Sequence, residues 1–196
     1  MPAWTDQRLV ILLPHEDPAF AHGKPYVVIE PGNKFGTGAH PTTRICLAIL
    51  EGVLFTDQTI LDVGTGTGIL GIYAAKVGGK NVVAVDQDLK ACKVCQQNFV
   101  KNSQGEKVRV INGRIDAVSQ LKLFDIVIAN LESDTLISLL PALKAHMKPS
   151  SLVVMSGVLA ISKEHFVSVL EASSLRVISS VTEGEWAGFL ATPSHR

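Results

Sequence analysis

The chain of 196 residues is long enough for one domain with a sizeable core, and its 46% apolar and 18% charged residues exclude an intrinsically disordered protein. Basic and acidic residues number 18 each, so the overall charge gives no case for binding nucleic acid or an anionic membrane, although such totals do not reveal a local basic patch. The start of the chain lacks a signal-peptide pattern, no apolar run approaches the roughly 20 residues of a membrane span, and three cysteines make no disulfide framework, so we expect a cytoplasmic protein.

The first 34 residues carry the weakest pattern. Ranges 8–13 and 26–30 are apolar and predict two short strands, separated by a loop that contains proline, histidine and aspartate. These strands either form a small hairpin or lie along the edge of the main sheet. We therefore treat residues 1–34 as an N-terminal extension of the domain formed by residues 35–196.

A loop dense in glycine and proline occupies residues 30–43 and leads into a helical pattern over residues 44–54. Pro41, Thr42 and Thr43 are typical helix-start residues. Threonine hydroxyls and free backbone N–H groups at a helix N-terminus suit a carboxylate or phosphate. The alternative is a capped helix with a turn before it and no ligand.

The stretch 59–69 is the centre of the pattern. Its apolar half, residues 60–63, predicts a strand buried on both faces, and residues 69–76 predict a helix. Between them stand Gly64, Gly66 and Gly68, which allow the backbone to pass close beneath a nucleotide-like ligand.

Strands and helices alternate through the remaining chain. Further strands are predicted at 81–86, 107–111, 124–130 and 151–157, helices at 88–101, 134–147 and 162–172, and two closing strands at 175–179 and 186–191. Alternation favours a mainly parallel sheet with helices on both faces, and two strands with no helix between them must be antiparallel. The predicted fold is α/β: a doubly wound, Rossmann-like, mainly parallel seven-stranded sheet with a C-terminal antiparallel hairpin.

The spacing of the glycines restricts which ligand the turn can bind. Dinucleotide-binding turns have the pattern G-x-G-x-x-G, whereas the third glycine here is Gly68 and the sixth position is Ile69. Asp86 ends the next strand, where a carboxylate accepts hydrogen bonds from both ribose hydroxyls, and Asp62 can meet an ammonium group directly or through water. An adenosine joined to a zwitterionic amino acid is S-adenosylmethionine.

Two longer segments make a more specific resemblance. Phe35-Gly-Thr-Gly-Ala-His-Pro-Thr-Thr43, taken with Leu61-Asp-Val-Gly-Thr-Gly-Thr-Gly-Ile-Leu70, Ala129-Asn130-Leu131 and Ser156-Gly157, resembles the catalytic domain of the methyltransferases of ribosomal protein L-eleven (the PrmA family) from about residue 30 to the end. The resemblance implies a class I methyltransferase that uses S-adenosylmethionine and acts on a ribosomal protein. The residues predicted to bind the cofactor, from motif and resemblance together, are Thr37, Thr43, Asp62, Gly64, Gly66, Gly68, Asp86 and Asn130.

The chain departs from that family in two places. About thirty residues are too few to fold the family's N-terminal substrate-recruiting domain independently, so we expect that domain to be absent. The segment Asn130-Leu-Glu-Ser-Asp-Thr-Leu136 replaces the family's usual Asn-Ile-Leu-Ala-(Asp or Gly)-Pro-Leu beside the expected acceptor entrance. Glu132 there either attracts a cationic acceptor or is a solvated residue at a helix start.

The acceptor is predicted from Asn130, which could orient an amine. No Pro-Pro-aromatic sequence follows it, in contrast to enzymes that methylate exocyclic nucleobase amines, so we predict a lysine or N-terminal amine of a protein. A methyltransferase of small molecules or RNA and a non-catalytic cofactor-binding module are the alternatives. Cys92 and Cys95 form a C-x-x-C within a helical pattern, and neither they nor the scattered histidines predict a metal site.

Overall fold

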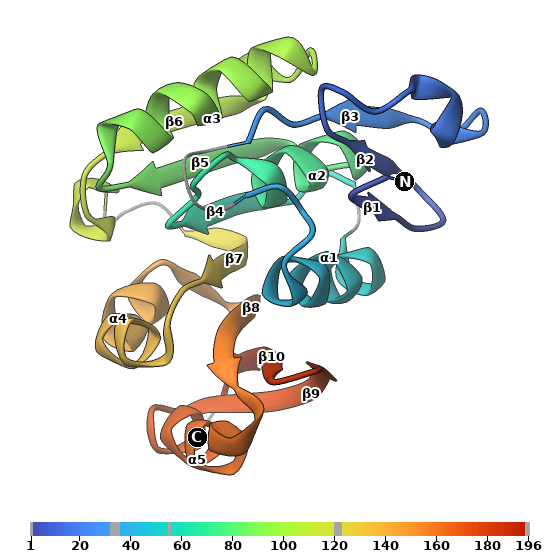
Figure 1. Cartoon of the computed structure of the whole chain (residues 1–196). Coiled ribbons are helices and arrows are strands. Elements are labelled where there is room, and N and C mark those ends of the chain that lie inside the picture. Colours follow the sequence, from blue (N-terminus) through green and yellow to red (C-terminus); the bar gives the residue numbers. More distant parts are fainter. Residues whose placement is uncertain (1, 32–35, 55, 120–122, 195–196) are drawn as a thin grey trace.

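The computed structural model describes residues 2–31, 36–54, 56–119 and 123–194. Its main sheet has seven strands in the order β6-β5-β4-β7-β8-β10-β9 (Figure 1). The strands are β4 (Thr59–Val63), β5 (Asn81–Asp86), β6 (Val108–Asn112), β7 (Phe124–Asn130), β8 (Met147–Leu159), β9 (Leu175–Glu183) and β10 (Trp186–Pro193). The first five are parallel, and β10 pairs antiparallel with both β8 and β9. The predicted fold class is therefore confirmed.

Helices cover both faces of this sheet. They are α1 (Pro41–Val53), α2 (Ile69–Val77), α3 (Leu89–Lys101), α4 (Ser133–Ala145) and α5 (Lys163–Ala172). The core on one face contains buried side chains of α1, α2 and α3, and the core on the other contains those of α4 and α5. Neighbours on β4 serve opposite faces, Ile60 in the first core and Leu61 in the second. This is why the central strands are continuous apolar runs rather than alternating ones.

The N-terminal strands are arranged differently from both predicted arrangements. They belong to a separate three-stranded sheet, β1 (Trp4–Thr5), β2 (Val10–Leu12) and β3 (Tyr26–Val28), in which β2 and β3 are parallel. The connection between β2 and β3 contains a 3₁₀ helix (Pro18–Ala21), so the chain returns to the same end before β3 begins. A parallel pair needs such a return, and the hairpin prediction was wrong.

The small sheet lies against α3 instead of the edge of the main sheet. Asn102 accepts from the Val28 N–H and donates to the Val28 carbonyl, both at 2.8 Å. Asn98 pairs in the same way with Glu30, at 2.9 and 3.0 Å. Two side-chain amides thus take the place of a neighbouring strand. The core of the main domain also includes apolar side chains of the small sheet and the residues next to its strands, namely Leu9, Ile11, Val27 and Ile29. The predicted boundary between residues 34 and 35 lies outside the described residues.

A single carboxylate fixes the start of the chain to α2. Asp6 accepts from the Tyr73 hydroxyl at 2.5 Å and the Trp4 ring N–H at 3.2 Å, and from the backbone N–H groups of Arg8 and Leu9 at 2.7 and 2.8 Å. Burial by itself raises the pKa of Asp6, but these hydrogen bonds outweigh it and hold the pKa below its ordinary value. The ionised carboxylate is therefore a structural element.

We expect Asp6→Ala to lower the free energy of unfolding by about 1–3 kcal/mol, because the Tyr73 hydroxyl loses a charged partner. Since the folded state lowers this pKa, the contribution is present above the unfolded-state pKa and is lost as the pH falls through the folded-state value. Urea unfolding at pH 7 measures the effect. The exposed Asp116→Ala is the control, expected within about 0.5 kcal/mol of the parent, and an equal loss in both variants would contradict the assignment.

Candidate functional site

The glycine turn between β4 and α2 has the conformation that its sequence predicts. Gly64, Gly66 and Gly68 have φ angles of +69°, +56° and +82°, in the region that disfavours side chains. A Cβ on Gly66 would meet nothing within 4 Å, so this part of the turn borders open space. A Cβ on Gly64 would lie 2.5 Å from Leu131 Cδ2, which packs directly over the turn.

Gly68 has a different surrounding from the other two. A Cβ there would lie 2.9 Å from Cys95 Sγ and 3.2 Å from the Phe99 ring. It therefore permits close packing between the start of α2 and the side chains of α3. Gly68 lines neither of the two cavities described below.

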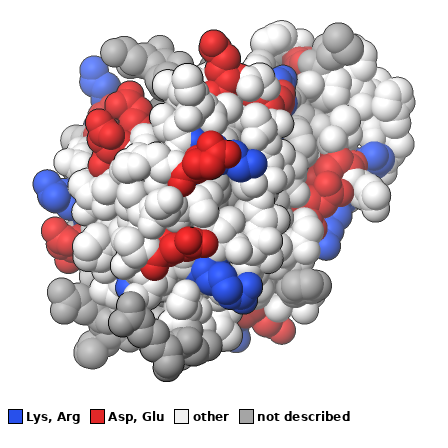
Figure 2. Space-filling view, turned by 90° about the horizontal axis from the view of Figure 1, so that it is seen from below, with Lys and Arg blue, Asp and Glu red and all other residues white. Residues whose placement is uncertain are grey.

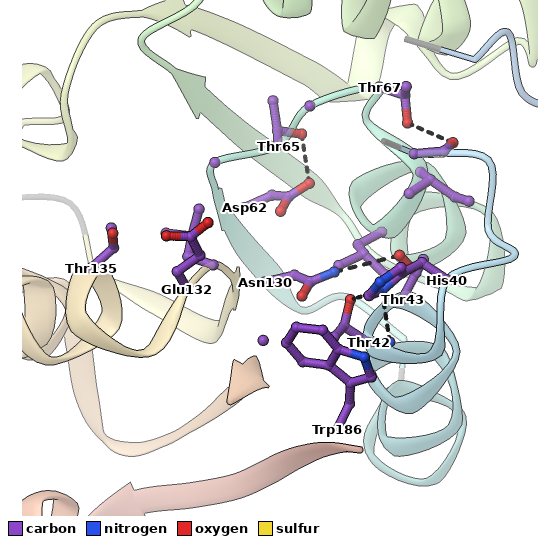
Figure 3. Close-up of a pocket in the computed structure, with 17 residues that line it drawn as sticks. His40, Thr42, Thr43, Asp62, Thr65, Thr67, Asn130, Glu132, Thr135 and Trp186 are labelled. Carbon is purple, nitrogen blue, oxygen red and sulfur yellow. Dashed lines mark hydrogen bonds between the residues drawn. The ribbon is translucent and has the colours of Figure 1, made fainter. Parts of the chain in front are cut away.

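The larger cavity, of about 420 Å³, lies where several chain segments converge (Figure 3). Its walls come from the start of α1, the glycine turn, the end of β7, the start of α4, the end of β8 and the start of β10. The lining residues are Gly36, His40, Thr42, Thr43, Asp62, Gly64, Thr65, Gly66, Thr67, Ile69, Leu70, Asn130, Leu131, Glu132, Thr135, Gly157 and Trp186. Five of the eight predicted binding residues are among them.

Asp62 is the buried charge of this cavity. The residue is 2% exposed, and its Oδ2 atom accepts from the Thr65 hydroxyl at 2.6 Å and the Gly71 N–H at 3.2 Å. Burial raises the pKa of Asp62 to about 6, against the lowering effect of those two hydrogen bonds. Ionising this carboxyl is costly in the folded protein, and a cationic ligand group beside it would offset that cost. The position therefore suits a cationic group.

Asn130 and Thr43 meet at the side of the cavity. The Asn130 amide at the end of β7 donates to the Thr43 hydroxyl on α1 at 3.4 Å. Thr43 belongs to the buried start of α1, whose cap residue is His40. Thr37 lies outside both cavities, and its hydroxyl accepts from the Ala39 N–H at 3.3 Å.

An aromatic wall that the sequence did not predict closes one side. Trp186, at the start of β10, has its ring centroid 5.2 Å from that of His40 in an edge-on arrangement. An ion pair between Arg44 on α1 and Glu183 on β9 joins the terminal hairpin to the same helix. His40 also contacts Thr42, with Nδ1 and Oγ1 2.8 Å apart. The sequence offered one indication of this wall, namely that Trp186 is a large aromatic residue at the start of a predicted strand.

The second cavity, of about 310 Å³, adjoins the first. Gly64, Leu131 and Thr135 line both. Asp86 lies in this second cavity, and its carboxylate accepts from the N–H groups of Gly66 and Asp88, both at 2.9 Å. Each carboxylate oxygen retains further acceptor capacity, so Asp86 can still receive ligand hydroxyls.

The stretch after β7 is held close to β8 by a fourth glycine, Gly157. Gly157 has φ +101°, and a Cβ there would lie 2.1 Å from the Leu131 carbonyl oxygen. The Leu131 N–H donates to the Ser156 carbonyl at 3.0 Å. Glu132 and Thr135 are thereby placed on the cavity wall opposite His40 (Figure 3).

The cysteines lie beside the site but line neither cavity: Cys95 Sγ is 3.8 Å from the Thr65 hydroxyl oxygen, and Cys92 Sγ is 3.4 Å from the Asp86 carbonyl oxygen. All three are free and buried, and burial raises the pKa of Cys95 to about 12. Across the described residues, no group of three or more histidine, cysteine, aspartate or glutamate side chains could hold a metal ion. No helix within the described ranges is long and apolar enough to cross a membrane.

Comparison with known proteins identifies relatives over most of the chain. The family model described as "Ribosomal protein L11 methyltransferase (PrmA)" matches residues 1–193. A relative of that name from Desulforamulus reducens is 34% identical over 189 residues, covering 96% of this chain and 61% of its own length. The first three curated relatives are covered over 57% to 61% of their length, so this chain spans about three fifths of them.

Solved structures agree in fold. The ribosomal protein L11 methylase from Lactobacillus delbrueckii subsp. bulgaricus has a TM-score of 0.86 and 26% identity, and the match covers 97% of both chains. Precorrin-6y C5,15-methyltransferase from Geobacter metallireducens matches with a TM-score of 0.66 and 16% identity over 85% of this chain and 94% of its own, which shows a shared fold alone.

We expect Asp62→Asn to stabilise the protein at pH 8 by about 1–3 kcal/mol, since it removes the cost of ionising a buried carboxyl. The folded-state pKa is raised, so the stability from the protonated carboxyl is present below the unfolded-state pKa and is lost as the pH rises through about 6. Urea unfolding at pH 8 and pH 4 tests this. The gain should shrink at pH 4, and a gain independent of pH would refute the explanation.

Proposed function

The chain belongs to the PrmA family, and on that premise we propose that it is an S-adenosylmethionine-dependent methyltransferase that transfers methyl groups to a lysine or N-terminal amine of a ribosomal protein. The observation that carries the proposal is the cleft formed by two adjoining cavities on the glycine turn, one lined by Asp62 and the other by Asp86. A ribosomal protein acceptor further implies action in the cytoplasm.

The residues along this cleft fit the proposed cofactor. Asp62 offers a buried carboxylate to its ammonium group, and the Gly66 backbone leaves space for close approach. Asp86 offers acceptor oxygens to ribose hydroxyls in the adjoining cavity. The N-terminus of α1 presents Thr43 near the same space, where a carboxylate is favoured.

The proposed reaction needs alignment more than acid or base chemistry from the chain. When bound, the cofactor supplies an activated methyl group on a sulfonium. The chain's part is to orient a neutral acceptor amine and exclude water. Asn130 is proposed to orient that amine through its carbonyl oxygen, because the amide nitrogen is engaged by Thr43. Trp186 narrows the same cavity with an apolar surface.

The alternative acceptors have less support. No lysine or arginine is among the residues that line the larger cavity, so nothing there attracts a phosphate backbone. On the face shown in Figure 2, acidic and basic groups are scattered among uncharged surface rather than gathered by sign. A module that only binds cofactor would need Asp62 and Asp86 but not the apolar wall formed by Trp186.

We expect Asp86→Ala to weaken binding of S-adenosylhomocysteine by about 1–3 kcal/mol, as measured by calorimetry, because hydrogen bonds to a charged acceptor are lost. The affinity of Asp86→Asn, which keeps one acceptor oxygen, should lie between those of Asp86→Ala and the parent. Since Asp86 also holds the Gly66 N–H, unfolding of each variant is measured in parallel. Equal affinity of the alanine variant and the parent would contradict the ribose assignment.

The acceptor is tested by incubating the protein with labelled S-adenosylmethionine and a cell extract, which is then fractionated. We expect label in protein, in a form resistant to mild base, as N-methyl groups are. Label confined to RNA or to small molecules would reject a protein amine as acceptor. Absence of calorimetric binding of either sulfur compound would reject the cofactor.

A further inference from the structure

One charged side chain on the cavity wall, that of Glu132, makes no hydrogen bond or ion pair with any described residue. Glu132 is the cap residue of α4, yet its carboxylate makes no capping hydrogen bond to the helix. Its backbone carbonyl accepts from the Leu136 N–H at 2.9 Å, but its carboxylate has neither hydrogen bond nor ion pair with any described residue. An acid at a helix start usually helps to cap it, so this exposed carboxylate is left available on the cavity wall.

The charges around the cavity give Glu132 a preferred partner. Asp62 and Glu132 are the acidic residues of its lining, and no lysine or arginine stands among them. Asp62 is buried beside the glycine turn, whereas Glu132 is exposed at the start of α4 (Figure 3). An acceptor that enters the larger cavity therefore meets the negative charge of Glu132 without a lysine or arginine in the same lining, while Arg114 of the adjoining cavity is paired with Asp116 at 3.8 Å.

The methylated amine itself is a poor partner for this carboxylate. A nearby negative charge favours the protonated form of an amine and so raises its pKa. The nucleophile must be the neutral amine, so an ion pair between it and Glu132 would reduce the reactive fraction. A second cationic group on the acceptor has no such conflict, because it stays charged throughout the reaction.

We propose that Glu132 recognises a second, permanently cationic group on the acceptor, a guanidinium or ammonium side chain flanking the target amine, and that this chain therefore selects amines within basic protein segments. The inference rests on the proposed function and names the acceptor class of that site. Glu132 acts on binding and selectivity, while Asn130 faces the amine.

The test uses two synthetic peptides, acetyl-Ala-Arg-Lys-Arg-Ala-amide and its twin with uncharged citrulline in place of each arginine. Their affinities for the S-adenosylhomocysteine-loaded protein are measured by NMR titration at low salt. We expect the parent to bind the arginine peptide about three- to fivefold more tightly, the range typical of exposed ion pairs. Glu132→Gln should bring the ratio close to one, and 0.5 M salt should do the same in the parent.

Asp134→Asn is the matched control, because Asp134 is an exposed acid in the first turn of α4 outside both cavity linings. It should keep the preference of the parent. The proposal would be overturned if the parent bound the two peptides equally well. It would also be overturned if Glu132→Gln and Asp134→Asn lost the preference for the arginine peptide to the same extent. Labelled methyl transfer to the same peptides tests the proposed function separately: a charge preference in binding without transfer would reject lysine as the acceptor amine and leave the recognition by Glu132 standing.

Discussion

The close approach of Leu131 to two glycines is the constraint on which the site depends. Its side chain lies where a Cβ of Gly64 would be, and its carbonyl oxygen lies where a Cβ of Gly157 would be. The ends of β4, β7 and β8 can meet only because both positions lack side chains. Leu131 also borders both cavities, so the same contact sets the width of the cleft and the starting point of α4.

Three acids along the cleft have three different environments. Asp62 is buried and reluctant to ionise. Asp86 is held by backbone N–H groups from the glycine turn and from the residue before α3. Glu132 is exposed and has no partner among the described residues. The same carboxyl group therefore has three different properties. In Asp62 it is a buried charge, in Asp86 a hydrogen-bond acceptor held in place by the backbone, and in Glu132 an exposed charge. The differences come from burial and hydrogen bonding.

The sequence predicted most of what depends on local pattern. The bounds of β5 and β7 agree with the predicted 81–86 and 124–130, because buried parallel strands are continuous apolar runs. Asp62, Gly64 and Gly66 were predicted beside a ligand because they stand at the end of a strand and in the glycine turn after it, and they do line the cavity. Gly68 could not be separated from its neighbours by sequence, since its close contact is with α3, about thirty residues further on. Trp186 was missed because its contact with His40 joins residues that are far apart in the sequence. The small sheet was misplaced because its edge is paired with asparagine side chains, which no strand pattern reveals.

Those asparagines bear on the solubility of the protein. The outer edge of a short strand is a template to which a strand of another molecule can add, and this is a common route to aggregation. On β3 and the residues after it, Asn98 and Asn102 satisfy N–H and carbonyl groups of Val28 and Glu30 from within the same chain. Both asparagines are themselves almost fully buried, so a competing strand has no access to them. One face of a helix thereby protects this edge from intermolecular pairing.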